Sequence, residues 1–273
     1  MIEENLGYHN FRIELPNGFE EVFTHFYFAE NRSGEAITKT LLPSYQTILV
    51  FSFGEKPYLV SKHGTRLEVN KYLLLGPIKQ AFEYTLPANT EILIVNFKDD
   101  AFYRIFGKVG VSEHLPIGPE DLVHGDYLGM LWYELSKMED THTRVNYVLK
   151  FSEPYLTNRN KIAAQLASVR EQPLNPIKSV AYQNNQSERN MQLQHKKHFG
   201  YSAKEHIRYL RFLKAVVSIQ SMASSTSKID WLQIVADCGY YDQSQLIKDF
   251  KHYINLSPTQ YLNFQQEICN PIS

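Results

Sequence analysis

Residues 235–244 read VADCGYYDQS and have the pattern of a helix, a sharp turn and a second helix. Gly239 adopts a positive φ at little steric cost, which suits a tight turn between two steeply crossed helices. Asp242 is a good N-cap, because its carboxylate can accept from free backbone N–H groups of the first turn. Gln245 follows three residues later, as in a capping box. The segment therefore predicts a helix-turn-helix unit.

A second copy of this pattern lies 55 residues upstream. Residues 181–187 (AYQNNQS) align with residues 236–242 (ADCGYYD), which puts Ser187 at the N-cap position. The alignment continues through the second helix of each unit, pairing Met191 with Leu246 and Phe199 with Ile254. Two tandem units are thus expected, and their second helices, here called the reading helices, are predicted over residues 187–198 and 242–253.

One helix over residues 203–222 is expected to join the two units. Its apolar residues share a face: Ile207, Leu210, Leu213 and Val217. In the second unit, Leu246 and Phe250 should pack on Val235 and Leu232 of the preceding helix. A rigid connector fixes the distance between the reading helices, and successive major grooves on one face of B-DNA lie about 34 Å apart. One chain could therefore reach two grooves without a partner.

The outward faces of the reading helices suit double-stranded DNA. Gln and Arg can form two hydrogen bonds with one base, while Lys and Arg neutralise phosphates. The candidates for base reading are Arg189, Gln192, Gln243, Ser244, Gln245 and Lys248. The candidates for phosphate contacts are Lys196, Lys197, Arg208, Arg211 and Lys251, and Lys248 could serve either role. In one copy alone, these polar residues could simply face solvent on a surface helix, whereas two copies in tandem favour DNA binding.

The charge of the chain is divided between its halves. Residues 1–154 carry 14 basic and 21 acidic side chains, whereas residues 155–273 carry 14 and 8, so the net charges are −7 and +6. A basic segment of this kind is expected to meet a polyanion. No apolar run approaches the roughly 18 residues of a membrane span, and the N-terminus lacks the apolar stretch of a signal peptide. With only two cysteines, Cys238 and Cys269, the protein is expected in the cytoplasm.

The first half is expected to be mainly β structure. Short runs rich in β-branched and aromatic residues alternate with Gly and Pro, at residues 45–53, 72–75, 83–86 and 91–97. Such runs favour an antiparallel sandwich or barrel, and helical periodicity follows at residues 128–135 and 158–169. The expected organisation is α+β: a β-rich sensor-like domain with trailing helices over residues 1–154, and an all-α DNA-binding domain over residues 155–273.

The C-terminal half resembles the AraC/XylS transcription regulators, on residues 235–244, Phe250-Lys251 and residues 256–262 (LSPTQYL). The resemblance implies a sequence-specific DNA-binding regulator. Two residues of the first unit depart from the family pattern. Leu193 stands where a basic base-reading residue is common, and His195 where an aromatic core residue is common. The sequence therefore leaves two roles for the first unit: reading bases, or mainly binding phosphates.

The N-terminal half resembles the sensor-like β domain of one branch of that family, on residues 41–43, 48–54, 75–77, 95–97 and 101–107. This implies a cupin-like domain that a small-molecule effector could control. Aromatic residues of the predicted strands either fill the core or line an effector pocket: Tyr45, Phe51, Phe53, Tyr72, Phe82, Tyr84 and Phe97. The helices at 128–135 and 158–169 are candidates for coupling or for a homodimer interface.

Catalysis is not expected. A cupin-type metal site needs closely spaced histidines and a carboxylate, whereas the histidines of the first half stand singly: His9, His25, His63, His114, His124 and His142. No Gly-rich phosphate loop, nucleophile elbow or carboxylate pair is evident, so no cofactor or metal is predicted. Two alternatives stay open: a protein-interaction module built on the same units, and a metal-dependent cupin-type enzyme.

Overall fold

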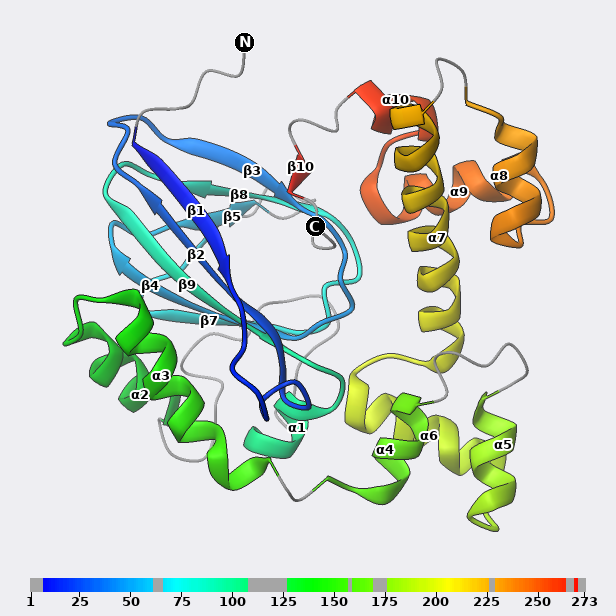
Figure 1. Cartoon of the computed structure of the whole chain (residues 1–273), viewed down its shortest axis with the longest axis horizontal. Coiled ribbons are helices and arrows are strands. Elements are labelled where there is room, and N and C mark those ends of the chain that lie inside the picture. The colour runs from blue at the N-terminus through cyan, green and yellow to red at the C-terminus, as the bar shows by residue number, and fades with distance from the viewer. Residues whose placement is uncertain are drawn as a thin grey trace.

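The computed structural model describes residues 7–60, 66–107, 127–156, 159–168, 176–225, 229–263 and 268–269. A β-rich unit lies beside a helical unit whose axis is one long helix (Figure 1). The expected α+β organisation, with antiparallel sheets first and helix-turn-helix units second, is confirmed. The division at residue 154/155 stays a prediction. Among the described residues, no helix combines the length and apolar character that a membrane span requires.

The β unit consists of two five-stranded sheets. The first sheet is antiparallel, in the order β1 (Tyr8–Ile13), β2 (Phe23–Asn31), β9 (Thr90–Phe97), β4 (Ile48–Gly54) and β7 (Tyr72–Leu75). The second has the order β10 (Ile268–Cys269), β3 (Ile37–Leu41), β8 (Phe82–Leu86), β5 (Tyr58–Val60) and β6 (Arg66–Glu68). The short strand β10 pairs parallel with β3, so a C-terminal segment lies on the edge of the N-terminal sheet.

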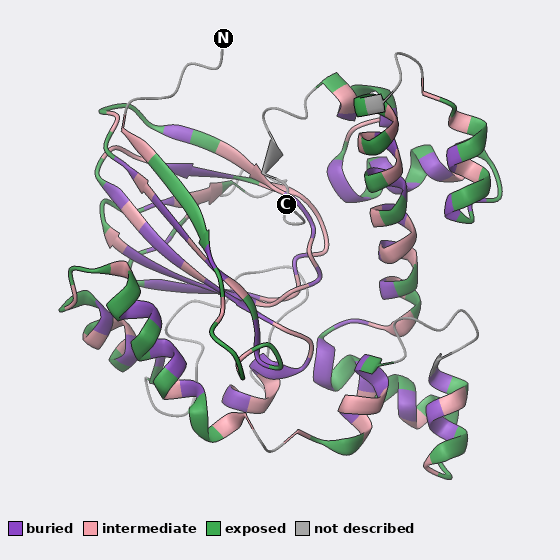
Figure 2. Ribbon diagram, in the orientation of Figure 1, coloured by how far each residue is buried: buried purple, intermediate pink, exposed green. Residues whose placement is uncertain are grey.

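The first sheet is buried on both faces, which explains the unbroken apolar runs of β4 and β9. Alternate residues such as Phe51 and Leu93 pack against α1 (Ala101–Phe106), α2 (Tyr127–Ser136) and α3 (Thr141–Ser152). The residues between them, such as Val50 and Ile92, face the second sheet. Figure 2 shows the resulting buried residues along these strands. The Trp132 indole donates to the Ser52 carbonyl at 2.9 Å and ties α2 to the sheet.

The four strands predicted from apolar runs all form, and the run at 72–75 coincides with β7. The run at 45–53 begins later, at Ile48, because Tyr45 has a left-handed backbone conformation (φ 54°) that ends strand geometry. The prediction did not include β1, β2, β3, β5 and β6. β1, β2 and β3 mix exposed polar and apolar residues, so their apolar runs are broken, and β5 and β6 have only three residues each.

The helical unit contains seven helices: α4 (Lys161–Ser168), α5 (Pro176–Gln183), α6 (Glu188–Phe199), α7 (Ala203–Ser225), α8 (Trp231–Cys238), α9 (Gln243–Ile254) and α10 (Pro258–Asn263), counted over the described residues. In Figure 1, α7 is a rod with α5 and α6 at one end and α8, α9 and α10 at the other. Its 23 residues span roughly 34 Å at about 1.5 Å per residue. The expected connector therefore exists and has the length of one turn of B-DNA.

Two packing predictions in this unit are confirmed only in part: Leu213 of α7 and Val235 of α8 pack against the core as expected, but other residues do not. Ile207 and Val217 of α7 are 53% and 48% exposed, because the aromatic residues Tyr209 and Phe212 face the core instead. Leu232 is 76% exposed, and Ile234 and Cys238 form the buried face of α8. Both helices carry two possible apolar stripes at helical spacing, and the stripe that meets the larger core is the one that is buried.

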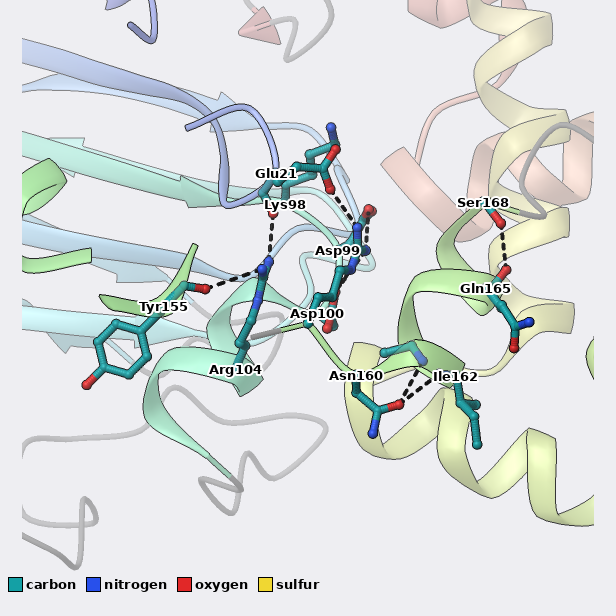
Figure 3. Close-up of polar contacts among 12 residues, drawn as sticks. Glu21, Lys98, Asp99, Asp100, Arg104, Tyr155, Asn160, Ile162, Gln165 and Ser168 are labelled. Atoms are coloured by element: carbon teal, nitrogen blue, oxygen red, sulfur yellow. Dashed lines mark hydrogen bonds and ion pairs between the residues drawn. The ribbon is translucent and has the colours of Figure 1, made fainter. Parts of the chain in front are cut away.

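Ion pairs anchor the start of the helical unit to the β unit. The Arg159 guanidinium pairs with Asp99 at 3.1 Å, with Asp100 at 2.9 Å and with Glu21 at 2.7 Å. Figure 3 shows Arg104 donating to the carbonyls of Glu21 and Tyr155, with Asn160 capping α4 nearby. The chain therefore enters α4 from a fixed point on the β unit.

Candidate nucleic-acid interface

The two reading helices, α6 and α9, have the same length and the same caps. Each has 12 residues. The Ser187 hydroxyl accepts from the backbone N–H of the third helical residue at 3.2 Å, and the Asp242 carboxylate does so at 2.7 Å. Each helix ends at a residue with left-handed backbone conformation, Gly200 or Asn255. The internal repeat is therefore a repeat of structure, and both predicted reading helices form.

Burial follows the same pattern in both helices. The fourth, eighth, eleventh and twelfth residues are buried: Met191, His195, His198 and Phe199 in α6, and Leu246, Phe250, Tyr253 and Ile254 in α9. α9 also buries its seventh residue, Asp249, whereas the seventh residue of α6, Gln194, is half-buried. The remaining residues form outward faces of similar geometry. Position by position, the two helices can therefore present side chains to two equivalent surfaces.

Most base-reading candidates lie on these outward faces. Arg189, Gln192, Gln243, Ser244 and Lys248 are exposed. Gln245 is half-buried, and its side-chain oxygen accepts from the backbone N–H of Tyr241, the residue before the N-cap, at 2.9 Å, in a variant of the capping box. Gln245 thus has a structural role that base reading does not explain. Base reading by these six residues stays a prediction.

The phosphate candidates divide into two groups. Lys196, Lys197 and Lys251 are exposed on the reading helices. Arg208 and Arg211 instead pair with the buried Asp249 carboxylate, each at 2.7 Å, and so fix α9 on α7. Phosphate contacts by all five residues stay predictions. The carboxylate of Asp249 is a site residue that the sequence reading missed, because a single Asp in a polar helix gives no signal of burial.

His195 and His198 of α6 pack in the core. His195 Nδ1 lies 2.7 Å from the Tyr201 carbonyl oxygen, and the ring of His198 contacts Tyr103 of α1 at 4.7 Å between centroids. Among the described residues, no three His, Cys, Asp or Glu side chains form a group that could hold a metal ion. Three histidines considered for a metal site, His63, His114 and His124, lie outside the described residues.

A cavity of about 110 Å³ lies between the two sheets of the β unit. Apolar side chains make most of its wall, among them Val50, Leu73, Phe82, Tyr84 and Ile92. Of the aromatic residues that could have lined a pocket, Phe82 and Tyr84 do so, whereas Phe51, Tyr72 and Phe97 fill the core on the other face of the first sheet.

The polar residues of the cavity wall include Arg12 and His25. Burial, together with the positive charge of Arg12, lowers the pKa of His25 to about 4. His25 is therefore neutral at neutral pH, and Arg12, an exposed residue, contributes a positive charge to the wall of the cavity.

The walls of the cavity continue directly into the contact with the helical unit. Tyr45 stacks on Tyr209 of α7 with 4.3 Å between ring centroids, and the Tyr209 hydroxyl donates to the Pro43 carbonyl at 2.7 Å. The Ala81 N–H donates to the Tyr253 carbonyl of α9 at 2.8 Å. We call these contacts the clamp. The clamp joins the β unit to the connector and to the second reading helix.

A salt bridge lies beside the clamp. Lys79 Nζ lies 3.0 Å from the Glu205 carboxylate on α7. Burial raises the pKa of Glu205, but hydrogen bonds from Ser202 and Lys79 outweigh it and lower the pKa to about 2. The carboxylate is therefore charged at any physiological pH and caps the start of α7 through Ser202.

Two matched reading helices on one connector, beside a β unit with an apolar cavity, define a DNA-binding transcription regulator. The C-terminal region is a helix-turn-helix domain of the AraC type, and residues 180–263 match the helix-turn-helix domain family. No curated protein matches the chain.

Several solved structures are similar to the chain. ToxT from Vibrio cholerae is 12% identical, with 94% of this chain and 98% of that chain covered and a TM-score of 0.41. ToxT from Vibrio cholerae strain SCE256 with bound unsaturated fatty acid is 11% identical, with 96% and 97% covered and a TM-score of 0.38. The AraC-like transcriptional activator CuxR is 10% identical, with 76% and 86% covered and a TM-score of 0.26.

Proposed function

We propose that the protein binds double-stranded DNA by placing α6 and α9 in two successive major grooves, and that a small molecule in the β cavity controls this binding. The observation that carries the proposal is the matched pair of helices, equal in length, caps and burial, at the two ends of α7. The connector length of roughly 34 Å equals the groove spacing on one DNA face. One chain then suffices for two grooves, and a homodimer would double the site.

The exposed residues fall into two groups, one for base edges and one for phosphates. Arg189, Gln192, Gln243, Ser244 and Lys248 point outward near the start of each reading helix, where such helices commonly meet base edges. Lys196 and Lys251 occupy the ninth residue of each helix and would neutralise equivalent phosphates. A protein that binds DNA in this way is expected in the cytoplasm.

The effector that fits the cavity is an apolar molecule with one anionic group. The wall is mainly aliphatic and aromatic, and the Arg12 guanidinium supplies a charge-assisted hydrogen bond for a carboxylate. The fatty acid named for ToxT belongs to this chemical class. We expect a medium-chain carboxylic acid to raise the melting temperature of the protein, and the Arg12→Gln variant to lose most of that increase.

Effector binding can alter DNA binding because the segments that line the cavity also form the clamp on the helical unit. Leu41, Ser44 and Phe82 line the cavity, while their neighbours Pro43, Tyr45 and Ala81 form the clamp. A ligand that displaces one wall therefore shifts the clamp. Control requires the ligand to bind the DNA-competent and the incompetent arrangement with different affinity.

The test of DNA binding is selection of random duplexes by the full chain at two salt concentrations. We expect a motif of two blocks about one helical turn apart. If all five phosphate candidates make contacts, log K falls by roughly 4–5 per log unit of salt, at about 0.9 per phosphate. If the full chain retains no duplex even at low salt, the DNA-binding proposal is contradicted and the protein-interaction module is favoured. Zinc or iron found by elemental analysis would favour the metal-dependent enzyme.

Gln245 offers a second test, because its capping and reading roles can be separated. Gln245→Ala removes both, and we expect relaxed preference at one base with a loss of about 1–3 kcal/mol on the best site. Gln245→Glu keeps the acceptor of the capping box but removes the amide donors that a base needs. If Gln245→Glu binds every sequence as the wild type does, Gln245 only caps the helix.

A further inference from the structure

The two reading helices differ in chemistry at one outward position. The sixth residue of α9 is Lys248, and the sixth residue of α6 is Leu193. Both are exposed, and Leu193 has 61% of its surface accessible. Because caps, length and buried residues match, these two side chains occupy equivalent places on the two reading faces. With α6 and α9 in successive major grooves, Leu193 and Lys248 would therefore face equivalent positions of the two half-sites.

Leu193 is an apolar side chain on a basic face. Arg189 lies one turn before it and Lys196 one turn after it, and both are exposed. The two cations favour an anionic surface, which an apolar protein patch does not provide. The major groove of an A·T pair offers phosphates at its rims and a methyl group, the thymine C5 methyl, on its floor. That surface satisfies the cations and the leucine together.

We propose that Leu193 is a specificity-determining residue that packs against a thymine methyl in the first half of the DNA site. The inference rests on the proposed function and adds the base class that α6 selects. At the equivalent position of the second half, the Lys248 ammonium would select guanine through its O6 and N7 acceptors. The two halves of the site would then differ, so a single chain would bind in one orientation only.

The test uses deoxyuridine, which lacks the C5 methyl and otherwise pairs as thymine does. Each thymine of the duplex selected by the full chain is replaced singly by deoxyuridine, and the dissociation constant is measured. For the wild type, we expect one replacement in the half bound by α6 to weaken binding about fourfold, the worth of one buried methyl group. Leu193→Ala should bind the thymine and deoxyuridine duplexes equally.

Lys248→Ala is the matched control, since it removes the equivalent side chain of α9 and should leave the deoxyuridine effect intact. Leu193→Lys should change the preferred base at that position from thymine to guanine. Both side chains are exposed, so neither substitution should unfold the protein.

Two outcomes overturn the assignment of Leu193: no thymine of the first half is sensitive, or the sensitivity persists unchanged in Leu193→Ala. In either case the selected motif and its dependence on Lys248 would still support DNA binding. If the wild type retains duplexes but prefers no sequence, base reading fails and the assignment of Leu193 with it, whereas binding of double-stranded DNA would stand.

Discussion

At the scale of the residue, His25 links pH to the stability of the β unit. Its pKa is about 4 in the folded protein, because of burial and of Arg12, against 6.5 for the ordinary imidazole. The unfolded chain therefore binds the proton more readily, and the free energy of unfolding falls as the pH drops from 6.5 to about 4. After allowance for solvent screening, we expect a loss on the order of 1–2 kcal/mol. Urea unfolding of the wild type and His25→Gln at pH 7 and pH 4.5 measures it: the variant should lose less, whereas the exposed control His9→Gln should match the wild type. Equal losses in all three would show that His25 keeps an ordinary pKa.

At the scale of the element, the orientation of α9 depends on Asp249. Its carboxylate is buried and holds both Arg208 and Arg211 of α7. Asp249→Asn leaves two guanidinium groups without their counter-ion, and because Arg208 is partly exposed we expect a loss of about 2–4 kcal/mol in the free energy of unfolding. Lys248→Ala, one residue away and exposed, should change it by less than about 0.5 kcal/mol. Urea unfolding compares the two. Similar values for both variants would mean that the ion pairs do not hold the helix.

At the scale of the whole molecule, we expect the clamp to make the β unit and the helical unit unfold cooperatively. Tyr45 is buried among Tyr201, Tyr209 and Tyr253, and Leu42 and Tyr45 belong to the core of the helical unit rather than to that of the sheets. Replacing Tyr45 by Ala removes a large buried side chain, at a cost of roughly 3–5 kcal/mol. Calorimetry should then resolve two unfolding transitions instead of one, and the effector should no longer change the affinity for DNA. Tyr147→Ala, on the exposed side of α3, is the control. A single transition in Tyr45→Ala would show that other contacts join the units.

Local sequence was sufficient for the helix-turn-helix units. Caps and turns depend on residues a few positions apart, so Ser187, Asp242 and Gly239 specify where the helices begin and end. The strongly apolar strands were also predictable, because a strand buried on both faces shows an unbroken apolar run. Such features depend on residues close together in the sequence, so they can be predicted without knowing which surface the element packs against.

What the sequence by itself determined is therefore the class of the protein and the outward faces of its reading helices. Only the tertiary structure decided which of two apolar stripes on α7 is buried, why Arg208 and Arg211 face Asp249, and how the cavity wall continues into the clamp. These contacts join residues far apart in the chain, such as Tyr209 and Pro43. No local preference encodes them, because each depends on the shape and charge of a surface that exists only once both units have folded.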